Sequence, residues 1–437
     1  MFLISLSAAL ICLIAFTTSN TANALNNGVA KLPVLGYNTW NAYQCNIDEG
    51  LILQTAQLMK SLGLQASGYE FVNIDDCWAE KNRTAAGDII EDQVRFKSGM
   101  KWLNQQIHAL GFKTGIYSDS GWFTCAGYPG SYSNELRDAQ TFADMGFDYL
   151  KYDNCAIPYD SITREGEVGR YQRMSDALAQ VGKSVGRNFV FSLCEWGWTQ
   201  VWMWGAQLGH SWRTTGDIST QWESLTAIIN FNSFLTQATN FYGRNDMDMV
   251  RNIFSGNGGL TFEEAKSHFT AWALMKSPLL IGTNLSAITP EILGILKNQE
   301  ILAINQDPVI GTSVSPFRWG INADWTSNDT HPAQFWSGQA QSGTVFMLLN
   351  TLDVPSTMSF NLTESPFIRA GRQYSVRDLW THTDNGTAVR NFTAENVPPH
   401  GIVALLLKDA GDEPAGLYPA CSVWFQCTDK NGTNVGG

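Results

Sequence analysis

Acidic residues follow a series of short apolar segments along the chain. Such a set could bind a metal, cleave a glycosidic bond with two carboxylates, or lie in solvated loops. Metal sites usually contain histidine or a loop dense in oxygen ligands, and none of the six histidines falls in these motifs. No metal and no cofactor is therefore expected. The acidic residues are Asp75, Asp76, Asp119, Asp153, Glu195, Asp217, Asp246 and Asp248.

The segment Phe147–Cys155 begins as an apolar strand and ends in three reactive side chains, Lys151, Asp153 and Cys155. Residues two apart in a strand share one face, so these three are predicted to point together. The Lys151 ammonium would keep the Asp153 carboxylate ionised, as a glycosidase nucleophile requires. Two alternatives are a structural ion pair at a strand end and a Schiff-base lysine of an aldolase-type barrel.

Asp217, in the segment Arg213–Ile218, is the candidate for a second catalytic carboxylate. A general acid must be protonated before it acts, and partial burial in an apolar, glycine-containing turn would raise the pKa of Asp217. Pairing with Arg213 would oppose this effect. Arg213 is therefore expected to contact the substrate and not to pair with Asp217.

Asp75 and Asp76 are adjacent, so in a regular strand they would point to opposite faces. Both can face one pocket only if the strand ends or bulges there, and Cys77 could supply that bend. The alternative places one of them in a buried loop network. Four tryptophans also follow strand ends, where an indole could stack on a sugar ring or lie in the core: Trp40, Trp78, Trp196 and Trp198.

Eight repeats of an apolar strand followed by an amphipathic helix would position these residues. Eight such units match a (β/α)8 barrel, in which all strand C-termini converge on one pocket. A doubly wound open sheet is the rival, but no switch point or glycine-rich phosphate turn is visible. The predicted strands end within residues 35–40, 72–76, 115–119, 150–153, 191–195, 211–213, 241–246 and 279–282.

Helix boundary signals support this repeat. Gly63, Gly111 and Gly146 each stand at a predicted helix end, one residue before an apolar strand start. Thr261–Glu264 is a capping box that opens the helix before the eighth strand, and Pro290 is predicted to begin a last helix.

The pattern changes after the barrel, predicted over residues 25–309. Short alternating runs replace the helical spacing, which predicts an antiparallel β-sandwich over residues 310–409, with a turn at Asp384–Gly386. A tail follows at residues 410–437. The runs are 333–336, 344–349, 358–362, 375–380 and 402–407.

The chain carries a formal net charge of −12 and has a pI near 5.0. Nucleic acids and anionic membranes both require a basic face, so neither is an expected partner. An acidic, aromatic-rich chain suits a neutral ligand such as a sugar. A monomer or a small homo-oligomer is expected.

The N-terminal residues 1–24 read as a secretory signal peptide, because an apolar run precedes the cleavage motif Ala22-Asn23-Ala24. The mature chain would start at Leu25, be extracellular, and have no membrane span. Eight cysteines are present, and the signal removes Cys12, so an odd number remains. The N-x-S/T sequons are Asn82, Asn284, Asn328, Asn361, Asn385, Asn391 and Asn431.

Together these residues resemble the glycoside hydrolase family 27 α-galactosidases (melibiases) of clan D, over nearly the whole mature chain. The resemblance implies a secreted, retaining, exo-acting enzyme on the predicted two-domain fold. The motifs that carry it are Leu35-Gly36-Tyr37-Asn38-Thr39-Trp40, Ile74-Asp75-Asp76-Cys77-Trp78, Thr124-Cys125-Ala126-Gly127-Tyr128-Pro129-Gly130-Ser131, Lys151-Tyr152-Asp153-Asn154-Cys155, Asn305-Gln306-Asp307-Pro308 and Val397-Pro398-Pro399-His400-Gly401.

The resemblance assigns roles to individual residues. Asp153 would be the nucleophile and Asp217 the acid/base, while Asp75 and Asp76 would hold the galactose 4- and 6-hydroxyls. Glu195 would fill the space that a 2-acetamido group needs, so galactose is favoured. The other pocket positions are Trp40, Tyr117, Cys125, Lys151, Trp196, Arg213, Asp248 and Met249.

The family pattern also implies two disulfides, Cys45–Cys77 and Cys125–Cys155. With a tail bridge Cys421–Cys427, Cys194 is the odd thiol. The sequence departs from the family at Met247, where proline is common, and at Asn284, where aspartate is common.

The aglycone is open between melibiose, raffinose-type oligosaccharides and galactomannan side chains. A non-catalytic galactose lectin on the same barrel is the alternative from another functional class.

Overall fold

Eight parallel strands form the core of the N-terminal part of the chain, in the order β7-β6-β5-β4-β3-β2-β1-β8. Val250, which follows β7, forms a parallel bridge with Ile281 of β8, so the two edges of the sheet meet. The predicted (β/α)8 barrel is therefore confirmed. The strands are β1 Leu35–Asn38, β2 Phe71–Asn73, β3 Lys113–Asp119, β4 Tyr149–Asp153, β5 Val190–Leu193, β6 Ser211–Arg213, β7 Arg244–Asp246 and β8 Leu279–Ile281.

This computed structural model describes residues 24–159, 162–250, 259–417 and 427–434. The predicted signal peptide, apart from its last residue, and Cys421 of the predicted tail bridge lie outside the described residues. Within the described part, none of the helices has the length and apolar character needed to cross a membrane.

Helices surround the barrel and begin and end where the sequence signals stand. Gly111 and Gly146 adopt positive φ angles of 93° and 99° at the ends of α3 and α4, a conformation that glycine tolerates best. The capping box at Thr261 forms, and Pro290 is the first residue of α9. The helix that starts at Pro290 is not the last one, because α10 follows it after Asn298, whose side chain caps the new helix. The helices are α1 Trp40–Tyr43, α2 Glu49–Ser61, α3 Met100–Ala109, α4 Glu135–Met145, α5 Ile162–Val185, α6 Gly205–Leu208, α7 Trp222–Ser233, α8 Phe262–Leu274, α9 Pro290–Leu296 and α10 Gln299–Asn305.

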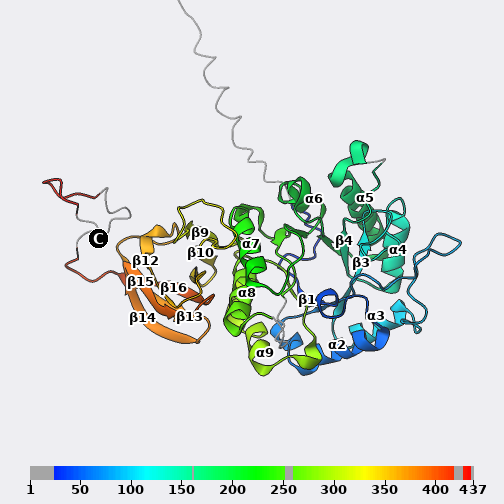
Figure 1. Cartoon of the computed structure of the whole chain (residues 1–437), viewed down its shortest axis with the longest axis horizontal. Coiled ribbons are helices and arrows are strands. Elements are labelled where there is room, and N and C mark those ends of the chain that lie inside the picture. The colour runs from blue at the N-terminus through cyan, green and yellow to red at the C-terminus, as the bar shows by residue number, and fades with distance from the viewer. Residues whose placement is uncertain (1–23, 160–161, 251–258, 418–426, 435–437) are drawn as a thin grey trace, which may run out of the picture.

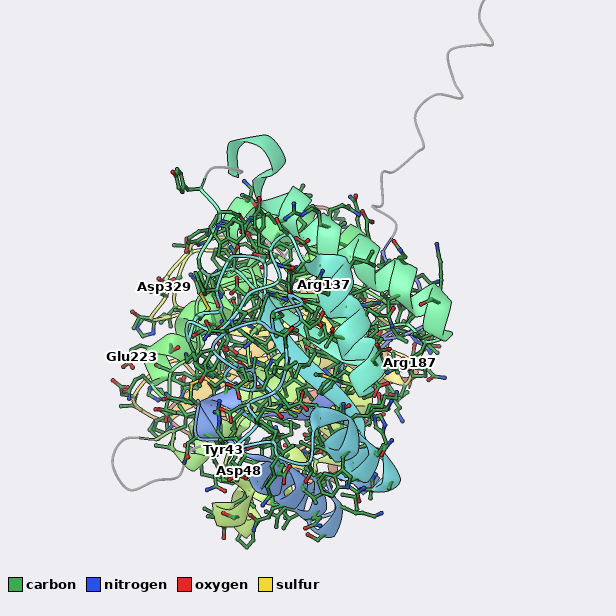
Figure 2. The ribbon with its side chains drawn as sticks, turned by 90° about the vertical axis from the view of Figure 1, so that its right-hand side faces the viewer. Tyr43, Asp48, Arg137, Arg187, Glu223 and Asp329 are labelled. Carbon is green, nitrogen blue, oxygen red and sulfur yellow. A yellow bond between two sulfur atoms is a disulfide. The ribbon has the colours of Figure 1, made fainter. Side chains whose placement is uncertain are left out.

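The two ends of the barrel face opposite sides of the molecule. Glu223, at the start of α7, and Arg187, between α5 and β5, lie at opposite edges of the view in Figure 2. Because every strand is parallel, all strand C-termini lie at one end, and the helices start there. The acidic residues at these strand ends therefore converge.

An antiparallel sandwich follows the barrel and confirms the second part of the fold prediction. Its larger sheet has the order β14-β13-β16-β11-β10-β9, and its smaller sheet pairs β12 with β15. Phe346 of the larger sheet stacks on Phe360 of the smaller, with 5.0 Å between ring centroids, in a core between the two sheets. The strands are β9 Ser315–Arg318, β10 Phe335–Ala340, β11 Gly343–Leu349, β12 Ser356–Asn361, β13 Arg372–Asp378, β14 Thr383–Val389, β15 Asn391–Val397 and β16 Ile402–Asp412.

Two details of the sandwich differ from the sequence expectation. Asp384–Gly386 is not a turn but part of β14, and the chain reverses at residues 379–382 instead. The strands β9, β14 and β15 were not anticipated. Most of β14 is exposed and polar, so it lacks the apolar alternation that marks a strand in a sequence.

The sandwich packs against α7 and α8 of the barrel (Figure 1). His400, two residues before β16, is central to this contact. Its ring stacks on Trp222 of α7, with 4.3 Å between centroids, and Nδ1 lies 2.6 Å from the Glu264 carboxylate of α8. The same glutamate closes the capping box of α8, so helix start and domain contact share one side chain.

Candidate active site

A cavity opens at the C-terminal ends of the barrel strands. It brings together residues that are more than 200 positions apart in the sequence, from Trp40 to Met249. Every predicted catalytic and substrate-binding residue except Glu195 lines it. The lining residues are Trp40, Asn41, Asp75, Asp76, Tyr117, Cys125, Lys151, Asp153, Trp196, Arg213, Asp217, Asp248 and Met249.

Asp153 is the last residue of β4 and lines this cavity as a buried residue. The Tyr117 hydroxyl donates to its Oδ2 at 2.8 Å, and the Asn154 backbone N–H donates to its Oδ1 at 3.0 Å. Burial raises the pKa of Asp153, and both Lys151 and the Tyr117 hydrogen bond act in the opposite direction. Both oxygens of this carboxylate are therefore held in place.

Lys151 is bonded differently from the sequence expectation. Its Nζ lies 2.8 Å from Oδ2 of Asp75, which makes Asp75 its ion-pair partner, and it acts on Asp153 only as a nearby charge. Burial disfavours the ammonium, but the surrounding groups, Asp75 first and Asp153 among the others, together outweigh burial and hold the pKa of Lys151 well above its usual range. A Schiff-base lysine must be neutral to attack a carbonyl, so the aldolase alternative does not fit this site.

The adjacent Asp75 and Asp76 both reach the cavity because β2 ends at Asn73. Asp75 accepts a hydrogen bond of 2.7 Å from Asn38, and Asp76 accepts one of 2.9 Å from the Ala126 backbone. The chain turns sharply after them, since Cys77 has a φ of 75°. The bend predicted at Cys77 is confirmed.

Asp217 lies at the rim of the cavity, with 70% of its side chain exposed. Arg213 Nη2 lies 3.1 Å from its Oδ1 and also 3.1 Å from Oδ2 of the buried Asp248. Burial acts to raise the pKa of Asp217, but the charge and hydrogen bond of Arg213 and the charge of Lys151 together outweigh burial and lower that pKa below its usual value. The expectation of a raised pKa, with Arg213 left for substrate alone, was therefore wrong, because Arg213 is close enough to pair with both carboxylates.

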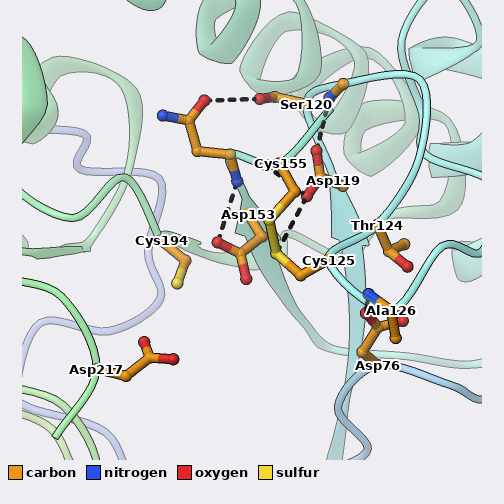
Figure 3. Close-up of a disulfide and its surroundings, with 12 residues drawn as sticks. Asp76, Asp119, Ser120, Thr124, Cys125, Ala126, Asp153, Cys155, Cys194 and Asp217 are labelled. Carbon is orange, nitrogen blue, oxygen red and sulfur yellow. Dashed lines mark hydrogen bonds between the residues drawn. A yellow bond between two sulfur atoms is a disulfide. The ribbon is translucent and has the colours of Figure 1, made fainter. Parts of the chain in front are cut away.

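Two disulfides brace the loops around the cavity, as the family pattern implies. Cys45 is bonded to Cys77, and Cys125 is bonded to Cys155. Figure 3 shows the Cys125–Cys155 bond beside Asp153, with Cys194 and Asp217 on the same side of it. Cys155 is thus a structural partner of Cys125 and no third reactive group beside Lys151. The Cys421–Cys427 bridge stays a prediction.

Cys194 is a free and buried thiol within the described residues. It is the residue that follows β5, and its Sγ lies 3.9 Å from Nη1 of Arg213. Burial is the main reason that its pKa lies well above the usual value, and the negative charge of Asp153 adds to the effect. The thiol is therefore protonated at neutral pH.

Glu195 does not line the cavity, unlike its sequence neighbour Trp196. Its side chain is fully buried, with 0% exposure, and one of its oxygens accepts a 3.4 Å hydrogen bond from Thr199. Burial, together with the charge of Glu167, raises the pKa of Glu195 to about 9. Glu195 thus lies behind the cavity wall in its neutral form.

The four tryptophans at strand ends divide between cavity and core. Trp40 and Trp196 line the cavity, and Trp198 lies beside Trp196 with 52% of its surface exposed. Trp78 instead is buried and donates its indole N–H to the Tyr117 carbonyl at 2.9 Å. Sequence reasoning missed Asn41, although it directly follows Trp40 in the first strand-end motif.

Met247 and Asn284, the two departures from the family pattern, each make a hydrogen bond to a neighbouring side chain. The backbone N–H of Met247 donates to the Ser277 hydroxyl at 3.0 Å, a bond that a proline could not make. Asn284 accepts a hydrogen bond of 3.0 Å from Tyr43. Neither contact involves Asp153 or Asp217.

A closed barrel whose strand ends bring four buried carboxylates and one exposed carboxylate into a cavity with aromatic walls is typical of a glycoside hydrolase. Comparisons with known proteins identify the family. Residues 32–307 match the family model described as "Alpha galactosidase A", and residues 330–407 match the "Alpha galactosidase C-terminal beta sandwich domain". The chain belongs to the α-galactosidases of glycoside hydrolase family 27.

Individual relatives agree with this assignment. A probable α-galactosidase B of Talaromyces emersonii is 41% identical over 87% of this chain and 93% of its own. The crystal structure of α-galactosidase I from Mortierella vinacea superimposes with a TM-score of 0.80, at 34% identity, over 89% of this chain and 100% of that one. An α-galactosidase from Saccharomyces cerevisiae, solved with raffinose, gives a TM-score of 0.77 at 29% identity, over 88% and 99% of the two chains.

Proposed function

We propose that this protein is a secreted, retaining exo-α-galactosidase in which Asp153 is the nucleophile and Asp217 the acid/base. A carboxylate oxygen of Asp153 attacks the anomeric carbon, and the glycosidic oxygen leaves with the proton of Asp217. Water then gives a proton to Asp217 and attacks the same carbon, which releases galactose and restores the Asp153 carboxylate. Two inversions give net retention.

The observation that carries this proposal is the contrast between the two carboxylates. Asp153 is buried with its oxygens held by Tyr117 and Asn154, as suits a group that must bond one carbon in one direction. Asp217 lies at the exposed rim, where a leaving group would meet solvent. A small cavity with this arrangement holds one terminal sugar, which supports exo action.

Galactose recognition would use the acidic side of the cavity. Asp75 and Asp76 would accept hydrogen bonds from the 4- and 6-hydroxyls, with Lys151 held beside them by its ion pair with Asp75. Trp40 would cover an apolar face of the ring. Glu195, being behind the wall, would act on selectivity by filling space near Trp196 rather than by direct contact.

The proposed substrates carry a terminal non-reducing α-galactosyl residue, as in melibiose and raffinose-type oligosaccharides and the side chains of galactomannan. The Saccharomyces cerevisiae relative solved with raffinose supports the oligosaccharide class. The open rim at Asp217 leaves room for sugars beyond the first.

Secretion and glycosylation belong to the same proposal. The signal peptide would span residues 1–24, followed by the barrel at 25–309, the sandwich at 310–409 and the tail at 410–437. Five sequon asparagines are exposed, whereas Asn284 and Asn328 are half-buried and bonded within their loops. We therefore expect glycan at the exposed set: Asn82, Asn361, Asn385, Asn391 and Asn431.

Asp153→Asn and Asp217→Asn test the assignment on an aryl α-galactoside. Each folded variant is expected to lose most activity, and a 2-deoxy-2-fluoro galactosyl donor should label Asp153 in the wild type. Full activity in either folded variant would exclude that residue from its role. Galactose binding without turnover by the wild type would instead indicate a lectin.

A further inference from the structure

Arg170 of α5 is a fully buried arginine close to the proposed nucleophile, with 1% of its surface exposed. It is not part of the cavity wall. A buried guanidinium is costly unless its hydrogen bonds are made, so the groups that it bonds matter. Nη1 donates to Ser120 Oγ at 2.7 Å, and Nη2 donates to Asn154 Oδ1 at 2.8 Å and to Glu167 Oε2 at 2.6 Å.

Two of these partners are the residues that directly follow the acidic ends of neighbouring strands. Ser120 follows Asp119 of β3, and Asn154 follows Asp153 of β4. The Ser120 hydroxyl also donates to Asn154 Oδ1 at 3.3 Å, and the Ser120 backbone N–H donates to the Asp153 carbonyl at 2.8 Å. Arg170 therefore joins α5 to the points at which both strands end.

The hydrogen bonds that start at Arg170 continue through Asn154 to the Asp153 carboxylate. The Asn154 backbone N–H donates to Asp153 Oδ1 at 3.0 Å, so the orientation of this peptide sets the position of that oxygen. On the other side of Asn154, the Cys155 N–H is held by Asp119 Oδ2 at 2.9 Å. The Asn154 side chain is a further attachment of this segment, in addition to the Cys125–Cys155 disulfide and the hydrogen bond to the Asp153 carbonyl. Arg170 and Ser120 are the groups that hold the Asn154 side chain (Figure 3 shows Ser120 and Asp153).

We propose that Arg170 is a positioning residue for catalysis: by holding the Asn154 side chain, it fixes the backbone N–H that aims Asp153 at the anomeric carbon. This inference rests on the proposed role of Asp153 as nucleophile. Arg170 touches no substrate, so its loss should slow bond formation and leave binding of the sugar nearly unchanged. A misplacement of a reacting group by about 1 Å costs on the order of 100-fold in rate.

A purely structural ion pair with Glu167 is the competing explanation. It predicts lower stability in Arg170 variants but an unchanged rate per folded molecule. Arg244 offers a matched control, because it is also a buried arginine, and within the described residues its guanidinium donates to the Ala30 and Lys31 carbonyls instead. It belongs to β7 and lies at the strand start, away from Asp153.

The test measures covalent labelling by a 2-deoxy-2-fluoro α-galactosyl donor with a good leaving group, which separates binding (KI) from bond formation (ki). The variants are Arg170→Lys, Arg170→Ala, Asn154→Ala and Arg244→Lys, each in the full-length protein at a temperature where it is folded. Asn154→Ala buries no unpaired charge, so it keeps the test valid if Arg170→Ala does not fold.

We expect ki to fall on the order of 10- to 100-fold in the Arg170 and Asn154 variants, with KI within about 2-fold of wild type. Arg244→Lys should keep its ki. Guanidinium added at low concentration should restore part of ki in Arg170→Ala but not in Asn154→Ala. Each measurement is compared with one in the same concentration of sodium chloride.

The outcomes are distinguishable. Label on Asp153 with an unchanged ki in Asn154→Ala and the Arg170 variants would overturn the positioning role and leave the proposed function standing. An equal loss of ki in Arg244→Lys would also overturn it, because the effect would then follow from general loosening. Label on a carboxylate other than Asp153 would overturn both proposals.

Discussion

Arg213 lies 3.1 Å from Asp217, the carboxylate that must donate a proton in the first step of the proposed reaction. The pair lowers the pKa of Asp217, whereas burial raises the pKa of Asp153. Both shifts oppose the states that the first step requires, a protonated acid and an ionised nucleophile. A substrate that draws Arg213 away from Asp217 would therefore raise the reactive fraction of the enzyme.

Arg213→Met should shift the pH dependence of the reaction. With the cation gone, the pKa of Asp217 rises, so the basic limb of kcat/KM on an alkyl or oligosaccharide α-galactoside should move to higher pH. The kcat/KM at the pH optimum should fall on the order of 10- to 100-fold, because the buried Asp248 loses its cationic partner. Steady-state kinetics across the pH range measures both effects.

A dinitrophenyl α-galactoside is the control for this variant, because its leaving group departs with little protonation. Its basic limb should respond much less to Arg213→Met. A basic limb that stays in place for the alkyl substrate would show that Arg213 does not set the pKa of Asp217.

Cys194 should be the site of inhibition by mercurials. Its thiol is buried beside Arg213 and the two catalytic candidates, so a bound mercury atom would crowd the cavity. Iodoacetamide should react slowly, because it requires a thiolate and burial keeps the pKa of Cys194 high. Activity and labelling are measured with and without galactose. Galactose bound in the cavity should protect Cys194 from the mercurial.

Cys194→Ser tests this assignment. The variant should remain active and should resist the mercurial. Inhibition that persists in Cys194→Ser would place the sensitive group elsewhere.

Glu195→Gln should change how stability depends on pH. The pKa of Glu195 is raised from 4.5 to about 9 in the folded chain, so above pH 4.5 the unfolded chain ionises while the folded chain stays neutral. This contribution to stability is present in full below the unfolded value and is lost as pH rises toward 9. Glutamine does not ionise, so the Tm of the variant should improve relative to wild type between pH 5 and pH 8.

Thermal melts of both proteins across this range measure the difference. Glu395→Gln, on the exposed strand β15, is the matched control and should track the wild type. A constant Tm difference between Glu195→Gln and wild type would mean that Glu195 ionises normally.

His400→Ala should weaken the contact between sandwich and barrel. The ring lies between Glu264 at 2.6 Å and Asp353 at 2.9 Å and stacks on Trp222. Loss of hydrogen bonds to charged groups costs about 1.5–3 kcal/mol each where they are buried, and less for the exposed Asp353. Calorimetry should show a lower Tm.

His382→Ala is the comparison for this variant. His382 also reaches a barrel glutamate, Glu300 at 2.7 Å, but its side chain is half exposed. Its loss should cost less than that of His400. An equal Tm for both variants would show that burial and stacking on Trp222 add nothing.

Much of the fold was determined by local patterns in the sequence. All eight barrel strands were predicted near their observed positions. The clearest are β2, β3, β4 and β5, which are short apolar runs beside a glycine-terminated helix or an acidic end. The strand β14 was not predicted, because its residues are mostly exposed and show no apolar alternation. Its extended conformation is set by pairing with β13 at the edge of the larger sheet.

The sequence also indicated most of the residues that meet in the cavity, since parallel strands in a barrel bring all their C-terminal residues to one end, although it missed Asn41 and included Glu195. The electrostatic pairing was decided only by the tertiary structure. Lys151 pairs with Asp75, which follows β2, Arg213 pairs with both Asp217 and Asp248, and the Glu195 side chain lies behind the cavity wall. Charges interact over a few ångströms in space, and spacing along the chain does not encode which oxygen lies nearest or how much water remains around it.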